Sequence, residues 1–177
     1  MAKKNVLFER DNFIGQLINR AGIAGVDIDG GMAVAEGSIV AGNDELYTLT
    51  PATADTKRVG IAFNPSVKYD NINGKLFPAK SLDDRDYTNP AGKPVDYFFP
   101  TVGIEFGINK AGIAGNTEPE VGDFLEIDAN GKYAIKQSQT AGVPSFEVVQ
   151  IIEQKYPTMT FADDVEKSYI IKTRYNG

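Results

Sequence analysis

The apolar residues of this sequence occur in short runs separated by turn-forming residues, and this pattern limits the folds open to the chain. Residues 32–35, 46–49 and 58–63 are such runs, and Gly, Asn, Asp and Pro residues stand between them. Short runs bounded in this way are typical of antiparallel strands. The sequence also holds 13 Val and 16 Ile against 7 Leu and 3 Met, and β-branched side chains fit a pleated surface. We therefore predict a mainly β protein, built as an antiparallel β-barrel or sandwich.

Two stretches of the chain repeat one order of features. The string AGIAG stands at residues 21–25 and again at 111–115. Each copy is followed by a strand-like run, a polar turn, a run that begins at Tyr47 or Tyr133, and a final run rich in Val and Ile. Offsets of roughly 85 to 90 residues indicate a diverged duplication of one β unit. The alternative is two unrelated hairpins that share turn chemistry, and the sequence leaves both open.

Residues 1–25 differ from the rest and are predicted to form an N-terminal arm ahead of a β domain at residues 26–177. Within residues 11–20, Phe13 and Leu17 are four positions apart and share one face of a predicted short helix. A helix of this length is marginal alone and has to pack on something. Two interpretations remain open: the helix packs on its own domain, or the arm docks on a partner subunit.

Residues 64–100 contain five Pro residues and are predicted to be a long loop excursion from the β domain. Because Pro lacks a backbone donor, we expect this stretch to lie outside the central sheet. Its aromatic residues predict that it is ordered, either against its own domain or against a neighbour. They are Phe77, Tyr87, Tyr97, Phe98 and Phe99.

Histidine and cysteine are both absent from the chain. Their absence excludes imidazole bases, thiol nucleophiles and thiolate metal sites. The densest carboxylate cluster, at residues 83–86, contains an interleaved Arg85, which is typical of a solvated, self-neutralising turn rather than of a catalytic pair. The loops that begin at Asp27 and Asp70 lack the Gly and Glu of a calcium-binding EF-hand. We predict no enzyme activity and no catalytic, cofactor-binding or metal-binding residues.

The formal net charge of −6, from 18 Lys and Arg against 24 Asp and Glu, disfavours nucleic acid and anionic lipid as partners. No run approaches the roughly 18 apolar residues of a membrane span, and the short apolar run at residues 6–8 is unlike a signal peptide. We therefore expect neither a nucleic-acid partner nor a membrane partner, and synthesis in the cytoplasm.

Five phrases of the sequence carry a family resemblance. They are EGSIV at residues 36–40, YTLTPA at 47–52, RVGIA at 58–62, DYTNPAGKPV at 86–95 and VGDF at 121–124. Together they resemble the capsid decoration (cement) proteins and related small head proteins of tailed bacteriophages. The resemblance implies a virion protein, made in the host cytoplasm, that binds the major capsid protein on the exterior of the assembled head. It also implies a homo-oligomer, with a trimer favoured, that stabilises the capsid.

A decoration protein needs surfaces that contact a lattice, and several apolar residues are candidates for them. Residues 6–8 are predicted to add a strand to an exposed capsid sheet edge, or the arm joins a neighbouring copy. The predicted partner-binding residues are Val6, Leu7, Phe8, Phe13, Leu17, Tyr97, Phe98 and Phe99.

Two other functions remain alternatives. Tail-tube and other tail-associated structural proteins also duplicate β units. A glycan-binding β module is a further alternative, with Tyr87, Tyr97, Phe98 and Phe99 as its aromatic platform.

Overall fold

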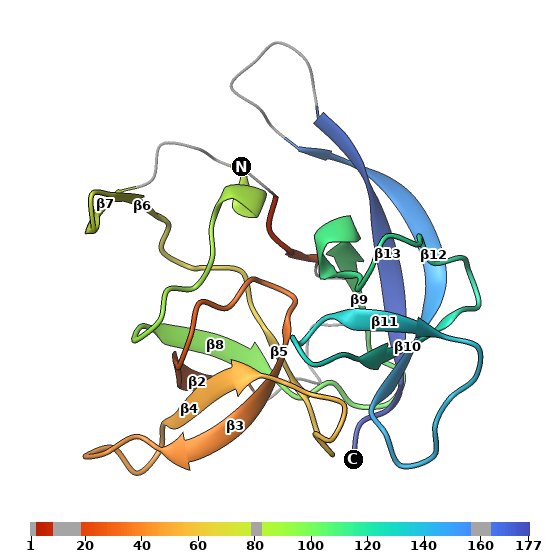
Figure 1. Ribbon diagram of the computed structural model, residues 1–177, viewed down its shortest axis with the longest axis horizontal. Coiled ribbons are helices and arrows are strands. Elements are labelled where there is room, and N and C mark those ends of the chain that lie inside the picture. Colours follow the sequence, from red (N-terminus) through yellow and green to blue (C-terminus); the bar gives the residue numbers. More distant parts are fainter. Residues whose placement is uncertain (1–2, 9–18, 79–82, 157–163) are drawn as a thin grey trace.

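A computed structural model of the chain describes residues 3–8, 19–78, 83–156 and 164–177, which form two β bodies packed side by side (Figure 1). In the first body, five strands close into a barrel. In order around it they are β2 (Asn19–Ala24), β4 (Tyr47–Pro51), β3 (Ala33–Ile39), β5 (Gly60–Ala62) and β8 (Pro94–Phe98). The prediction of a mainly β barrel fold is confirmed.

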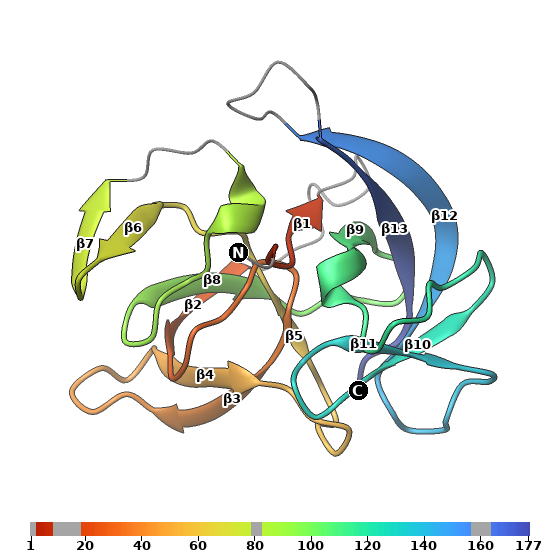
Figure 2. The same ribbon diagram turned by 45° about the horizontal axis from the view of Figure 1, so that its top comes forward.

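The second body is a six-stranded antiparallel sheet. Its strand order is β1 (Leu7–Phe8), β9 (Glu105–Asn109), β13 (Asp164–Tyr175), β12 (Ser145–Tyr156), β10 (Phe124–Ile127) and β11 (Tyr133–Lys136). Strands β12 and β13 form a long curved ribbon that extends past the other strands (Figure 2). A small hairpin, β6 (Tyr69–Ile72) with β7 (Lys75–Pro78), and two 3-10 turns, η2 (Asp84–Asp86) and η3 (Lys110–Gly112), complete the elements. Within the described ranges, no helix is long and apolar enough to span a membrane.

The two bodies share one strand arrangement. In the first, β3 pairs with β4 and β5, β5 pairs with β8, and β8 pairs with β2, all antiparallel. In the second, β10 pairs with β11 and β12, β12 pairs with β13, and β13 pairs with β9, again antiparallel. The AGIAG strings occupy matching places. The first lies largely in β2, which runs parallel to β4, and the second contains Ile113, which forms a parallel bridge with Tyr133 at the start of β11. The structure therefore favours a repeated β unit over two unrelated hairpins.

One apolar core runs through both bodies. Its largest cluster joins Ile61 and Phe98 of the barrel to Phe106 and Phe146 of the sheet. A second, smaller cluster, which includes Leu49 and Tyr97, fills the barrel itself. Gly60 makes room in that cluster, because a Cβ there would lie 2.7 Å from a ring carbon of Tyr97. Because the main cluster is shared, the two bodies pack as a single unit.

Three sequence predictions need correction here: the boundary at residue 25, the end of the helix and the place of residues 64–100. The boundary predicted at residue 25 is not a structural one, because β2 already belongs to the barrel and β1 pairs with β9. The predicted helix lies mostly outside the described residues, and its last two positions, Asn19 and Arg20, are in β2. The excursion at residues 64–100 does contain central sheet: β8 lies between β2 and β5. Its Pro94 stands at the first position of the strand, where a missing donor is tolerated.

Candidate functional site

The structure uses most of the predicted partner-binding side chains in its own core. Val6, Leu7, Tyr97 and Phe98 are buried, and Phe8 and Phe99 are half-buried. Phe13 and Leu17 lie outside the described residues. The aromatic platform for a glycan is also wrong as predicted, because Tyr87 is buried together with Tyr97 and Phe98. Of the predicted residues within the described ranges, the half-buried Phe8 and Phe99 remain as surface candidates.

The N-terminal strand is already paired within the chain. Leu7 lies opposite Ile108 in β9, and Phe8 lies opposite Gly107. On its other side, Asn64 accepts a hydrogen bond from the Leu7 backbone N–H at 2.8 Å and donates one to the Leu7 carbonyl at 2.9 Å. The main-chain groups of Leu7 are therefore engaged, and the capsid-edge pairing predicted for residues 6–8 is corrected to an internal one.

The acidic cluster at residues 83–86 is the centre of an ion-pair network, which we call the Arg85 knot (Lys3, Asp83, Arg85, Asp86 and Glu166). Arg85 is 2% exposed and holds Asp83 through two hydrogen bonds, Nε to Oδ1 at 3.0 Å and Nη2 to Oδ2 at 2.9 Å. Its Nη1 donates to Glu166 Oε2 on β13 at 2.9 Å. Lys3 Nζ donates to Asp83 at 2.9 Å and to Asp86 at 2.7 Å. The knot ties the N-terminal segment, η2 and β13 together.

The knot keeps the Asp83 carboxyl group ionised down to about pH 2. Burial by itself raises the pKa of a carboxyl group, but hydrogen bonds from Arg85 and Lys3 outweigh it and lower the pKa of Asp83 to about 2. A general acid needs the opposite shift. The prediction that Arg85 neutralises this cluster is confirmed, whereas the predicted solvation is wrong for Asp83, which is 4% exposed.

A second polar group lies on the barrel, next to Phe99. The buried Tyr97 hydroxyl donates to Glu36 Oε1, and Arg20 Nη1 donates to the same oxygen at 3.0 Å. Burial, and then the Glu36 carboxylate, raises the pKa of Tyr97 well above its usual range. The Arg20 guanidinium carbon stands 5.3 Å from the centroid of the Phe99 ring. Phe99 therefore lies next to the Arg20–Glu36 ion pair.

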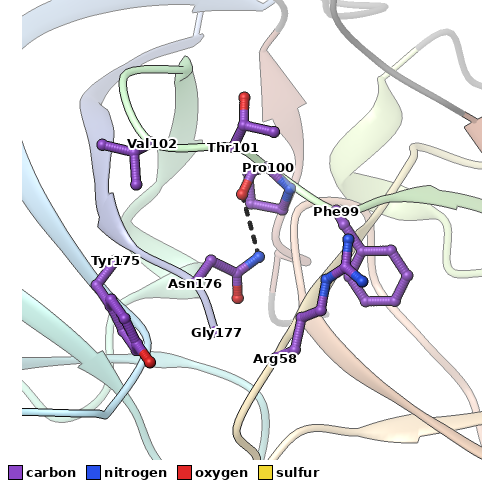
Figure 3. A pocket seen from close by; sticks show the side chains of 8 residues that line it. All are labelled: Arg58, Phe99, Pro100, Thr101, Val102, Tyr175, Asn176 and Gly177. Carbon is purple, nitrogen blue, oxygen red and sulfur yellow. Dashed lines mark hydrogen bonds between the residues drawn. The ribbon is translucent and has the colours of Figure 1, made fainter.

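A pocket of about 260 Å³ opens at the seam between the two bodies (Figure 3). It lies where the chain leaves β8 for β9 and where it continues beyond β13. We call it the seam pocket, and its lining residues are Arg58, Phe99, Pro100, Thr101, Val102, Tyr175, Asn176 and Gly177. The Arg58 guanidinium lies over the Phe99 ring, with its carbon 4.2 Å from the ring centroid.

Asn176 forms the floor of the seam pocket and fixes its shape. Its side-chain oxygen accepts from the Val59 N–H at 2.8 Å. Its nitrogen donates to the carbonyls of Val59 at 2.9 Å and Pro100 at 3.1 Å. The buried side-chain amide of Asn176 thus joins the chain just after β13 to the segment that leads into β5 and to the segment that follows β8.

No protein-family model matches the sequence, and no curated protein sequence matches it. Among solved structures, the chain is similar to the N base of the head fiber gp8.5 in bacteriophage phi29, with 12% sequence identity. That alignment covers 91% of this chain and 98% of the other, with a TM-score of 0.46. A TM-score of this size does not establish a shared fold, so function has to follow from the residues of this chain.

Neither Arg58 nor Asn176 was among the site residues predicted from the sequence. Arg58 stands at the start of a strand-like run, and Asn176 stands 117 positions after Val59, to which it bonds. No local pattern marks a contact between such distant residues. A signal was present only in the three consecutive aromatic residues 97–99, of which the last reaches the seam pocket.

Proposed function

We propose that this chain is a structural, non-catalytic protein of a tailed-phage head that decorates and stabilises the capsid by binding the assembled shell. In this proposal its partner is the major capsid protein, its place is the capsid exterior, and it is made in the host cytoplasm. The resemblance of residues 36–40, 47–52 and 86–95 to decoration proteins supports this assignment.

One observation carries the proposal: the densest acidic cluster of the chain holds the molecule together. Asp83 is buried and paired with Arg85 and Lys3, and these partners lower its pKa to about 2. These carboxylates brace the N-terminal segment against β13 instead of serving as proton donors. A protein that reinforces a shell needs a rigid body and contact surfaces, and both the knot and the shared core supply rigidity.

We further propose that the chain binds as a homo-oligomer, with a trimer favoured. Several copies that meet a symmetric lattice at once convert weak single contacts into durable attachment. The net charge of −6 suits a partner that is recognised by shape and local contacts rather than by a polyanionic backbone.

The test mixes the purified full chain with preformed heads of the encoding virus and measures the protein that sediments with them. We expect saturable binding at a stoichiometry that matches the symmetry of the shell. Absence of saturable binding would overturn the proposal. Hexameric rings or tubes of the chain alone, seen by electron microscopy, would overturn it in favour of a tail-tube protein.

Truncation of residues 1–10 is unsuitable for this test. Val6 and Leu7 are core residues, and Leu7 is held by Asn64. The truncation would weaken the fold as well as any contact with the head. The contact surface is better located by comparing amide hydrogen exchange in the free chain and in the chain bound to heads, since protection gained on binding reports the covered residues.

A further inference from the structure

The seam pocket is a preformed site rather than a surface irregularity. Asn176 fixes its floor by donating two hydrogen bonds and accepting one, and Pro100 restricts the backbone of one wall. A volume of about 260 Å³ holds roughly eight water molecules at the volume each has in the liquid. The pocket therefore has room for one side chain of moderate size without rearrangement.

Arg58 presents to this pocket a cation that forms no ion pair within the described ranges. It stacks on Phe99, and no carboxylate there lies within ion-pair distance of its guanidinium. This contrasts with the other described arginines, since Arg20, Arg85 and Arg174 each pair with a carboxylate. Stacking fixes the plane of the guanidinium and leaves its edge free to donate two parallel hydrogen bonds.

The other walls combine hydroxyl groups with exposed apolar surface. Tyr175 and Thr101 line the pocket, and no hydrogen bond from either hydroxyl occurs in the part of the chain that the structure describes. Val102 is 68% exposed, the largest value among the exposed large apolar side chains in the same ranges. The site thus offers a planar cation and an apolar lip.

We propose that the seam pocket binds an acidic segment of a partner protein, with the carboxylate of one Asp or Glu side chain held by Arg58 and an adjacent apolar side chain packed on Val102. A carboxylate matches the two parallel donors of a guanidinium. The net charge of −6 disfavours a polyanion more than a segment with one negative group beside an apolar side chain. The occupant is therefore an acidic peptide rather than nucleic acid.

The test titrates the isotopically labelled full chain with the peptide Ac-Ala-Val-Glu-Val-Ala-NH₂ and follows NMR shifts. We expect saturable shifts at the Arg58 side chain and at the backbone amides of Thr101, Val102 and Asn176. Replacing the central Glu of the peptide by Gln should weaken binding about tenfold, the size of one charge-assisted hydrogen bond. The Arg58→Gln variant should lose about the same factor.

Lys57→Gln is the matched control, because Lys57 is the exposed neighbour of Arg58 and does not line the pocket. We expect it to keep peptide affinity within about twofold, since surface charges outside a site contribute little. Because Arg58 is exposed, we expect the Arg58→Gln variant to fold as the parent does. The amide signals of residues outside the pocket should therefore be unchanged.

Three results would overturn the proposal. They are equal affinity for the Glu and Gln peptides, unchanged affinity in Arg58→Gln, and tighter binding of inorganic phosphate than of the Glu peptide. The last would assign the pocket to a phosphate group instead. The titration needs no capsid, so its failure leaves the proposed attachment to heads standing, and failure of head binding leaves the pocket assignment standing.

Discussion

At the scale of single residues, buried and half-buried amides join segments that are far apart in sequence. Asn64 binds both backbone groups of Leu7, Asn89 donates to the carbonyls of Ile28 and Phe63, and Asn176 spans the seam. An amide carries both donors and acceptors, so one side chain can satisfy the backbone groups of loops that lack a ladder partner. These residues fix where the loops of this protein lie.

Asn176→Ala should lower the free energy of unfolding by about 2 to 3 kcal/mol, because it leaves the Val59 N–H and two carbonyls without their partner in a buried place. Urea unfolding of the variant and the parent measures the difference. Asn116→Ala is the control, since Asn116 is exposed, and it should stay within about 0.5 kcal/mol. A loss of unfolding free energy no larger than that of the control would show that Asn176 does not hold these segments together.

Asp83 makes stability depend on pH in the acid range. Its pKa is about 2 in the folded chain against 3.8 for an unperturbed Asp carboxyl, so the folded state favours the ionised form. The resulting contribution, about 2 kcal/mol, is complete above about pH 4 and is lost as the pH falls towards 2. Asp83→Asn should be less stable than the parent at pH 6, and the gap should close towards pH 2. Urea unfolding at a series of pH values measures the gap, and a constant gap would contradict the assignment.

At the scale of elements, β1 is held on the side away from β9 by one side chain, that of Asn64. Besides its short pairing with β9, the strand is held by the two hydrogen bonds of Asn64 to Leu7. Asn64→Ala should cost about 1 to 2 kcal/mol and should speed amide hydrogen exchange at residues 5–8, while β2 to β4 keep their protection. Asn43→Ala is the control, since the Asn43 side chain accepts a hydrogen bond from the nearby Glu45 N–H in an exposed turn. Unchanged exchange at residues 5–8 would show that β9 alone holds the strand.

Sequence alone predicts the elements whose signals are local. The order of turn, Tyr-led run and Val/Ile run gave the repeated unit as one of two open interpretations, because each strand of that unit carries its own alternation and its own turn. The same reasoning misplaced β8, since it counted five Pro residues in 64–100 without their positions. Pro94 begins the strand and Pro100 follows its end, so the intervening residues keep every donor.

The candidate sites were harder to predict because they depend on contacts across the chain. The pattern at residues 83–86 shows that Arg85 can neutralise a carboxylate, but it does not show that Lys3 and Glu166 complete the network and bury it. Arg58 and Asn176 meet only once both bodies are folded and packed. Apolar residues such as Val6 and Tyr97 fit a core and an interface equally well by type, and burial alone separates the two.

At the scale of the whole molecule, a chain of aromatic rings couples the two bodies. Phe106 on β9 meets Phe98 of the barrel at 6.0 Å between ring centroids and Phe146 of the sheet at 5.8 Å. Both contacts are edge-to-face, an arrangement that stabilises beyond simple burial. Because all three rings are fully buried in the shared core, neither body can open without exposing apolar surface of the other.

Phe106→Ala should therefore destabilise both bodies together, by about 3 to 5 kcal/mol. NMR signals from β4 and β11, followed through a urea titration, should disappear at one midpoint in the parent and at one lower midpoint in the variant. Val121→Ala, at an exposed position, is the control and should change stability by less than about 0.5 kcal/mol. Separate midpoints for β4 and β11 would mean that each repeat folds by itself and that the seam joins two independent domains. The rigidity that the proposed function requires would then be lost, because the seam pocket would change shape whenever the two domains moved.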